Sequence, residues 1–186
     1  IPRLLKDGWD VHYVGAADSV EERLIRPIPK VAYHTVACGK LRRYLDPKNL
    51  TDPFKVIRGV AQARRLIKQL KPNVVFSKGG FVSVPVVYGA RMNGVPIVSH
   101  ESDMTPGLAN KITSPFVNVL CCAFPEAAKL AGPKGLYTGS PIRPEILQGD
   151  RRRGLKRFGF KDGIPVIMVT GGSSGAVAIN DAVIEA

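Results

Sequence analysis

One stretch of the sequence, beginning at Val74, constrains the fold more than any other. An apolar run at Val74–Phe76 stops at Ser77–Gly80, and an apolar helical stretch follows from Val82 to about Met92. A second apolar run at Val95–Val98 then leads into the polar residues His100–Asp103. Continuous apolar runs are typical of parallel strands that are buried on both faces. The order strand, glycine turn, helix, strand therefore predicts a βαβ unit in a parallel α/β sheet.

The polar residues of this stretch lie where its two strands are expected to end. Ligands of open α/β sheets bind outside the carboxyl ends of the strands. Gly79 and Gly80 leave no side chain above the sheet, and His100 with Glu101 offers a base and a carboxylate. A tight turn explains the two glycines equally simply. The histidine and carboxylates have no partner cluster with metal-ligand spacing, so we expect no metal and no cofactor.

The composition adds a strong positive charge. The formal net charge is +12 over 186 residues, which implies an anionic partner such as nucleic acid, a membrane surface or a phosphorylated substrate. The three cysteines have neither disulfide nor metal spacing and fit a reducing compartment. No signal peptide or membrane-spanning run is evident. The ends at Ile1 and Ala186 resemble cuts, so we expect an internal fragment of a cytosolic protein.

The rest of the chain continues the alternation of strands and helices. A helix N-terminus is expected at Ser19, and a glycine turn, GGSSGA, lies between an expected strand at 164–170 and a final helix. The segment 148–161 is polar and basic and has the composition of a connector. Further strands are expected at 9–15, 31–38 and 117–124. Further short helices are expected to start at 105–107 and to span 126–131.

The helix that begins near Asp52 has two apolar stripes. Val56, Val60, Ala63, Ile67 and Leu70 form one buried face. The opposite face carries apolar residues beside cations, which suits the headgroup region of an anionic membrane. A covering loop is the alternative. The residues of this predicted membrane patch are Phe54, Ile57, Ala61, Arg58 and Arg65.

Two further features are compatible with phosphate binding. GGSSGA at 171–176 follows an expected strand and precedes a helix, so its backbone N–H groups are candidates for an anion cradle. It matches neither the P-loop nor the G-x-G-x-x-G pattern, and a tight turn is the alternative. Arg143, between Ile142 and Pro144, is a candidate for a bidentate phosphate contact, although a surface ion pair is the ordinary role of an isolated arginine.

Together these motifs resemble the MurG family of bacterial glycosyltransferases, which belongs to glycosyltransferase family 28. SKGGFVSVP, GVPIVSHESDMTPGLANK, AFPEAAK, TGSPIRPEIL and GGSSGA occur in that family's order and spacing. The resemblance covers essentially the whole chain and implies a GT-B fold of two Rossmann-like domains. It assigns residues 1–143 to an acceptor- and membrane-binding domain, 144–162 to a basic connector, and 163–186 to the beginning of a UDP-sugar domain.

The resemblance also implies an activity. These enzymes transfer N-acetylglucosamine from UDP-N-acetylglucosamine to lipid I with inversion, giving lipid II for peptidoglycan synthesis. They work as peripheral proteins on the cytoplasmic face of the plasma membrane. The histidine discussed as catalytic base would precede Ile1, and most donor contacts would follow Ala186. The 186 residues alone are therefore expected to be inactive.

Matched position by position, the resemblance assigns site residues. His100 and Glu101 match a His-Glu pair that supports catalysis. Three positions depart from common family residues: Phe81 replaces tyrosine, Asp103 replaces asparagine and Ser174 replaces glutamine. The implied acceptor-binding residues are Gly79, Gly80, Phe81 and Ser83, and the implied donor-binding residues are Arg143, Gly172, Ser173 and Asp103.

Other functions remain open on the residues alone. Another GT-B transferase that acts on a glycolipid, or a UDP-sugar epimerase of that architecture, would share the glycine turns. A basic Rossmann-like domain that binds nucleic acid would explain the charge but not the two glycine turns. The chain also lacks the stacking aromatics of a single-strand groove. We therefore expect no nucleic-acid partner.

Overall fold

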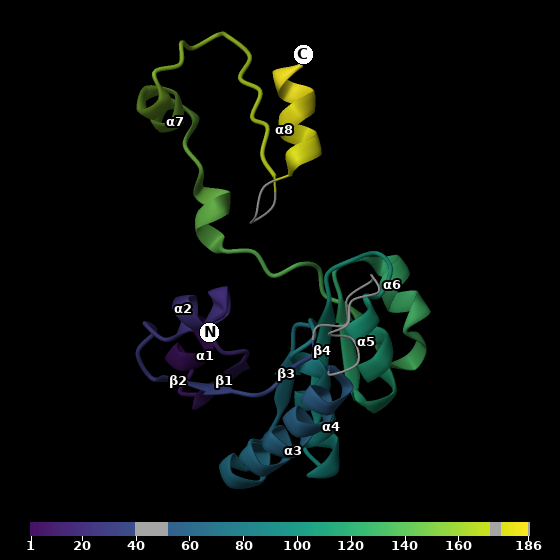
Figure 1. The fold of residues 1–186 in the computed structure, drawn as a ribbon. Helices are drawn as coiled ribbons and strands as arrows, with labels where there is room; N and C mark the ends of the chain where they lie inside the picture. Colours follow the sequence, from purple (N-terminus) through teal and green to yellow (C-terminus); the bar gives the residue numbers. More distant parts are fainter. Residues whose placement is uncertain (40–51, 172–175, 186) are drawn as a thin grey trace. The chain divides into compact units, whose positions relative to one another are not determined.

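The computed structural model describes residues 1–39, 52–171 and 176–185, in two compact units formed by residues 1–141 and 142–186 (Figure 1). Residues 40–51 and most of the GGSSGA turn lie outside the described residues. The first unit contains α1 (Pro2–Lys6), β1 (Val11–Gly15), α2 (Val20–Ile25), β2 (Val31–Thr35), α3 (Asp52–Leu70), β3 (Val75–Ser77), α4 (Ser83–Met92), β4 (Ile97–Glu101), α5 (Leu108–Thr113), η2 (Ser114–Phe116), β5 (Val119–Cys122), α6 (Pro125–Leu130), η3 (Gly132–Lys134) and β6 (Gly135–Tyr137).

All strand pairs in the described residues are parallel. β1 pairs with β2, and β3, β4, β5 and β6 form a sheet in that order. Helices connect consecutive strands of this second sheet, so the parallel α/β prediction is confirmed. The register pairs Ser77 of β3 with Ser99 of β4, which brings the carboxyl ends of these strands side by side.

The core of the first unit lies between the four-stranded sheet and its helices. α3 runs beside α4 (Figure 1), and the two backbones approach closely at Gly89. A Cβ atom at Gly89 would lie 2.8 Å from the Arg64 nitrogen, so a glycine is required for this packing. The buried core residues are Ile67, Val87, Ala90, Ile97, Val117, Leu120, Cys122 and Ala127.

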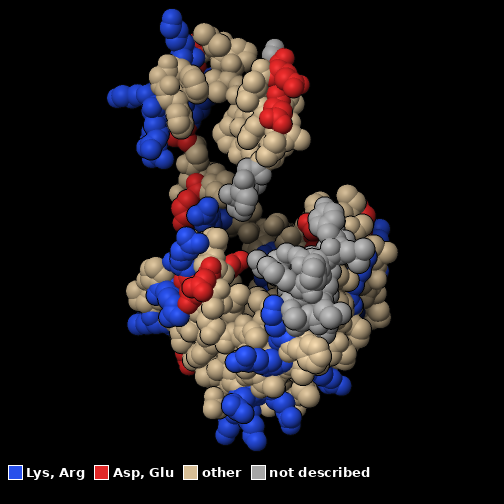
Figure 2. Space-filling view, viewed as in Figure 1, with Lys and Arg blue, Asp and Glu red and all other residues tan. Residues whose placement is uncertain are grey.

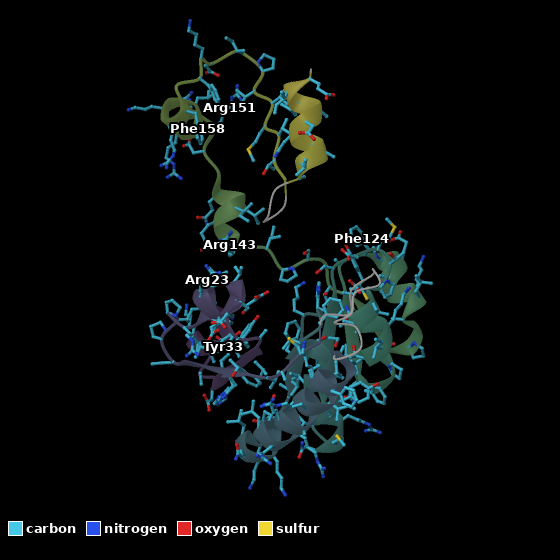
Figure 3. The ribbon with its side chains drawn as sticks, in the orientation of Figure 1. Arg23, Tyr33, Phe124, Arg143, Arg151 and Phe158 are labelled. Atoms are coloured by element: carbon cyan, nitrogen blue, oxygen red, sulfur yellow. The ribbon has the colours of Figure 1, made fainter. Side chains whose placement is uncertain are left out.

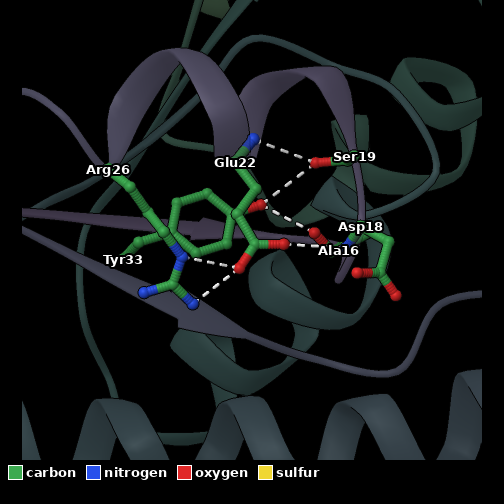
Figure 4. Close-up of polar contacts among 6 residues, drawn as sticks. All are labelled: Ala16, Asp18, Ser19, Glu22, Arg26 and Tyr33. Carbon is green, nitrogen blue, oxygen red and sulfur yellow. Dashed lines mark hydrogen bonds and ion pairs between the residues drawn. The ribbon is translucent and has the colours of Figure 1, made fainter.

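The N-terminus of α2 is capped as the sequence predicts. The Glu22 backbone N–H donates to Ser19 Oγ over 3.1 Å, which satisfies one of the donors that begin a helix without a partner. The Glu22 carboxylate accepts from the Asp18 backbone N–H and from Arg26, over 2.7 Å each (Figure 4). The Tyr33 hydroxyl of β2 donates to the Ala16 carbonyl over 2.7 Å. Ser19 Oγ lies 3.2 Å from the same Tyr33 hydroxyl, which attaches the cap of α2 to β2.

α3 has the two faces that its sequence predicts. Ala63 and Ile67 are buried against the core, whereas the opposite face leaves Phe54 74% exposed and Ile57 67% exposed. Lys and Arg side chains gather over the region of α3 in the space-filling view (Figure 2). Among the described residues, no helix combines the length and apolar character needed to cross a bilayer.

The second unit differs from its prediction in two places. A helix, α7 (Arg151–Phe158), occupies the polar segment expected to be a connector; Asp150 caps it by accepting from the Arg153 N–H over 2.8 Å. The prediction of a strand at 164–170 is wrong, because the structure shows no strand there and Ile167 is 87% exposed. A strand needs a partner for its backbone groups, and the described residues of this unit provide none. The unit also contains η4 (Pro144–Gln148) and α8 (Val177–Ile184).

Candidate functional site

Five polar residues gather at the carboxyl ends of β3 and β4. We call them the strand-end cluster: Lys78, His100, Glu101, Ser102 and Asn110. Lys78 follows β3 directly, while His100 and Glu101 are the last two residues of β4. Ser102 begins the loop after β4, and Asn110 belongs to α5. The parallel register of β3 and β4 brings these residues together, at the sheet edge where α/β folds bind ligands.

Glu101 holds the loop after β4 in place. It is only 4% exposed, and its Oε1 accepts from the Asp103 backbone N–H over 2.9 Å. Its Oε2 accepts from the Gly107 N–H over 2.9 Å and from Asn110 Nδ2 over 2.8 Å. Burial alone would raise the pKa of this carboxyl, but these hydrogen bonds and one from the Ser102 backbone hold the pKa below its ordinary value. Glu101 is therefore an ionised structural support for the loop.

His100 is buried and both of its ring nitrogens are occupied. It is 3% exposed. Its Nδ1 lies 2.7 Å from Lys78 Nζ, and its Nε2 lies 3.0 Å from the carbonyl oxygen of Gly139. Lys78 Nζ also donates to Ser102 Oγ over 2.7 Å. The predicted base is therefore already engaged by a lysine that the sequence analysis did not single out.

The glycine turn between β3 and α4 requires its glycines. Gly79 and Gly80 have φ angles of 88° and 81°, a region that residues with a Cβ rarely adopt. Ser83 is buried and supports the turn, because its hydroxyl donates to the Gly80 carbonyl over 2.6 Å. Phe81 is 37% exposed beside the turn. The turn thus has a fixed backbone with no side chain at two successive positions.

The predicted donor-binding residues are distributed over both units. Asp103 is exposed, and its backbone N–H supports Glu101. Arg143 belongs to the second unit, where it is exposed and immediately precedes η4 (Figure 3). Gly172 and Ser173 lie outside the described residues, as does Ser174. The structure therefore brings His100, Glu101, Gly79 and Gly80 together within one unit, and the roles of all these residues stay predictions.

Sequence reasoning missed Lys78, Asn110 and Gly139 as partners in the site. Lys78 stands beside the two predicted glycines, so its place at a strand end was a usable signal. Asn110 occurs in the quoted stretch GLANK, but a contact nine residues from Glu101 depends on how α5 folds back over β4. The Gly139 carbonyl lies 39 residues beyond His100, and no sequence pattern indicates that pairing.

A parallel α/β unit with polar side chains at neighbouring strand ends has the architecture of a Rossmann-like domain. The chain belongs to glycosyltransferase family 28, because the model of the family's N-terminal domain matches residues 1–121. The fold supports the same class. A crystal structure of Acinetobacter baumannii MurG matches with a TM-score of 0.62 and 26% identity, over 76% of this chain and 40% of that one. The predicted GT-B class is confirmed.

The chain is also similar to curated relatives along its whole length. It is 51% identical over 186 residues to the UDP-N-acetylglucosamine–N-acetylmuramyl-(pentapeptide) pyrophosphoryl-undecaprenol N-acetylglucosamine transferase of Clostridium tetani. It is 50% identical over 188 residues to the protein of the same name in Clostridium novyi. Each match takes in 100% of this chain but 52% of the relative, so the chain spans about half the length of these proteins. The resemblance to the MurG family is confirmed.

Proposed function

We propose that this chain is the acceptor-binding half of an inverting N-acetylglucosaminyltransferase that converts lipid I into lipid II. The observation that carries the proposal is 51% identity to the Clostridium tetani transferase across all 186 residues. In this reaction a hydroxyl oxygen of the lipid-linked muramyl sugar attacks the anomeric carbon of UDP-N-acetylglucosamine. The bond to UDP breaks as the new glycosidic bond forms, and the hydroxyl proton passes to a base. UDP leaves with the bonding electron pair.

The strand-end cluster and the glycine turn form the acceptor site in this proposal. Gly79, Gly80 and Phe81 lie beside the acceptor diphosphate, and Ser83 fixes the turn from beneath. His100 and Glu101 support the site without transferring the proton, since the ring nitrogens of His100 and the carboxylate of Glu101 are occupied. Residues 1–143 would then form the acceptor domain, followed by the connector 144–162.

Three of the four proposed donor-binding residues belong to the second unit. Arg143 carries a permanent charge and can bind a phosphate in a bidentate manner. We assign it to the diphosphate of UDP-N-acetylglucosamine, together with Gly172 and Ser173 of the glycine turn. Asp103 is assigned to the donor sugar. Residues 163–186 would begin the UDP-sugar domain. None of the residues assigned here is proposed to hold a metal ion or a cofactor.

The exposed face of α3 is the proposed membrane contact. Phe54, Ile57 and Ala61 follow helical spacing, and Arg58 and Arg65 lie beside them on the same exposed face. Apolar side chains enter the headgroup region while arginines attract anionic lipid. A lipid-linked acceptor remains in the membrane, so its enzyme must reach that surface. We therefore assign the protein to a peripheral position on the cytoplasmic face of the plasma membrane.

A chimera tests the proposed reaction directly. The chain replaces the matching half of the Clostridium tetani transferase, and the product is assayed with UDP-N-acetylglucosamine and a short-chain lipid I analogue. We expect turnover, and we expect Arg143→Ala to reduce it by about 100-fold because a charge-assisted phosphate contact is lost. A folded chimera that does not turn over would contradict the proposal and favour another glycolipid acceptor.

A further inference from the structure

The most unusual group at the strand ends is the ammonium of Lys78. The β3–β4 register aligns Ser77 with Ser99, so Lys78 and His100 follow as neighbours at the carboxyl edge. Lys78 Nζ donates to Ser102 Oγ over 2.7 Å and lies 2.7 Å from His100 Nδ1. His100 at the end of β4 and Ser102 just after it thus fix the end of the long Lys78 side chain.

The partners of His100 determine which ring nitrogen carries its proton. A lysine ammonium only donates hydrogen bonds, so Nδ1 of His100 must accept from Lys78. The Gly139 carbonyl only accepts, so Nε2 of His100 must carry the hydrogen. His100 is therefore a neutral imidazole protonated at Nε2. A ring with both nitrogens occupied in this way positions Lys78 and is not available as a base.

Lys78 is a cation with neutral partners. In the part of the chain that the structure describes, no carboxylate lies within ion-pair distance of Lys78, and its third N–H has no partner. Partial burial lowers the pKa of Lys78, against an opposing effect of Glu101, whose oxygens are bonded elsewhere. Lys78 is nevertheless exposed as a residue, so an anion from solvent can reach this ammonium, which has no counter-ion within ion-pair distance.

Gly79 and Gly80 follow Lys78 with no side chains, and no atom lies within 4 Å of a Cβ position at Gly80. Asn110 is 6% exposed, and its Oδ1 has no hydrogen-bond partner among the described residues. That oxygen would lie 3.5 Å from a Cβ atom at Gly79, so it lies directly against the turn. Asn110 Oδ1 is thus an unsatisfied buried acceptor against the glycine turn that follows Lys78.

We propose that Lys78 binds a phosphate oxygen of the substrate diphosphate, with neutral His100 and Ser102 as positioning residues. The assignment to the lipid-linked acceptor rests on the proposed function, whereas the binding of a diphosphate by Lys78 does not. The strand-end cluster thus supplies a charge to the acceptor, and His100 acts through Lys78 rather than on the reacting atoms.

The first test is the tautomer of His100. Long-range ¹H–¹⁵N spectra of the chain give separate shifts for protonated and unprotonated ring nitrogens. The chain has only three histidines, so His12→Asn and His34→Asn variants assign the remaining signals to His100. We expect a protonated Nε2 and an unprotonated Nδ1. A proton on Nδ1 would overturn the positioning role.

The second test measures the binding of inorganic pyrophosphate to the chain by calorimetry. We expect Lys78→Met to weaken binding by about 10- to 100-fold, the effect of one charge-assisted hydrogen bond. Lys129→Met, an exposed lysine on α6, is the charge-matched control and should leave affinity unchanged. Equal affinity of the parent and Lys78→Met, or no binding by the parent, would overturn the assignment.

Two variants of His100 separate positioning from simple packing. Asn keeps a side-chain oxygen near the Nδ1 position, so His100→Asn should retain pyrophosphate affinity within a few-fold. His100→Leu provides no acceptor and should weaken binding as much as Lys78→Met does. Amide spectra establish whether each variant is folded, and Lys78→Met tests the proposal even if a His100 variant unfolds. Equal affinities of the Asn and Leu variants would contradict the positioning role.

The chimera separates this inference from the proposed function. Lys78→Met should raise KM for the lipid I analogue by at least tenfold and leave KM for UDP-N-acetylglucosamine unchanged. If the chimera is active but Lys78→Met does not change KM for the lipid I analogue, the inference is wrong and the proposed function stands. If the chimera is inactive but pyrophosphate binding by the chain depends on Lys78, the proposed function is wrong and the inference stands. If Lys78→Met instead raises KM for UDP-N-acetylglucosamine, Lys78 binds the diphosphate of the donor and the assignment to the acceptor is wrong.

Discussion

The strand-end cluster and the exposed face of α3 place polar and apolar groups in opposite environments. At the ends of β3 and β4, the buried side chains of His100 and Glu101 are bonded to neighbours. On α3, the apolar side chains of Phe54 and Ile57 are exposed. A buried charge needs fixed partners, whereas an exposed apolar side chain gains by reaching another surface. Substitutions in the strand-end cluster should therefore lower stability, and substitutions on the exposed face of α3 should weaken membrane binding.

The largest expected effect is the loss of the Glu101 carboxylate. Glu101→Gln places an N–H donor where backbone N–H groups donate, and we expect a loss of about 3 kcal/mol in the free energy of unfolding at neutral pH. Urea unfolding of the parent and of Glu101→Gln measures this difference in the free energy of unfolding. The exposed Glu145→Gln should change stability little. A Glu101 variant as stable as its parent would show that the buried hydrogen bonds do not hold the loop.

The same carboxylate predicts a pH dependence. The pKa of folded Glu101 lies below its ordinary value, so the unfolded chain takes up this proton first as pH falls. The stabilisation is complete above the ordinary glutamate pKa of about 4.3 and decreases as pH falls through the lower folded value. The difference in stability between the parent and Glu101→Gln should shrink across that acidic window. A constant difference would contradict the assignment of an ionised Glu101.

The next effect tests the apolar side of α3. Phe54→Ser combined with Ile57→Ser should weaken binding to vesicles rich in phosphatidylglycerol by about 30-fold, because two apolar side chains no longer enter the bilayer surface. Stability should not fall, since both residues are exposed. Val20→Ser with Leu24→Ser removes two similarly exposed apolar residues of α2 and should leave binding intact. Equal loss in both variants would indicate nonspecific adhesion.

The charges on the same face should have a smaller, salt-dependent effect. Arg58→Gln with Arg65→Gln should weaken vesicle binding by about tenfold at low salt, with a difference that diminishes as salt screens the surface. Arg152→Gln with Arg157→Gln removes the same charge from α7 and serves as the control. Identical losses would attribute the effect to net charge rather than to the α3 face.

The smallest effect concerns the glycine turn. Gly79→Ala forces a Cβ into a φ of 88° and should cost about 1 kcal/mol in stability. Gly154→Ala, within helix α7, should instead be neutral or stabilising, because no atom lies within 4 Å of its Cβ position. Urea unfolding gives the change in the free energy of unfolding of each variant relative to the parent. Equal stability changes would show that the conformation of the turn is not what requires Gly79.

The sequence predicted the β3–α4–β4 unit well because each element has a strong local signal. Apolar runs, glycines and helical spacing lie within a few residues of one another, and the two faces of α3 follow from periodicity alone. The strand expected at 164–170 failed because strand formation depends on a partner, which periodicity does not specify. α7 was missed because its basic composition obscured the capping residue Asp150.

The candidate site was predictable only in part, for a similar reason. His100, Glu101 and the two glycines are recognisable from their places at strand ends. The contact between Lys78 and His100 depends on the register of β3 and β4, and the contact between Glu101 and Asn110 depends on how α5 packs. The sequence therefore indicated a base at His100, whereas the geometry shows an imidazole that is already bonded to a lysine and a carbonyl.

The most direct test of the central claim is to titrate the isotopically labelled chain with a short-chain lipid I analogue and follow its backbone amides. The proposed acceptor site predicts shifts concentrated at residues 77–83 and 100–107, with little change at α2 and α7. UDP-N-acetylglucosamine should not reproduce this pattern. Shifts confined to other elements, or none at saturating analogue, would contradict the assignment of the acceptor to the strand ends of β3 and β4.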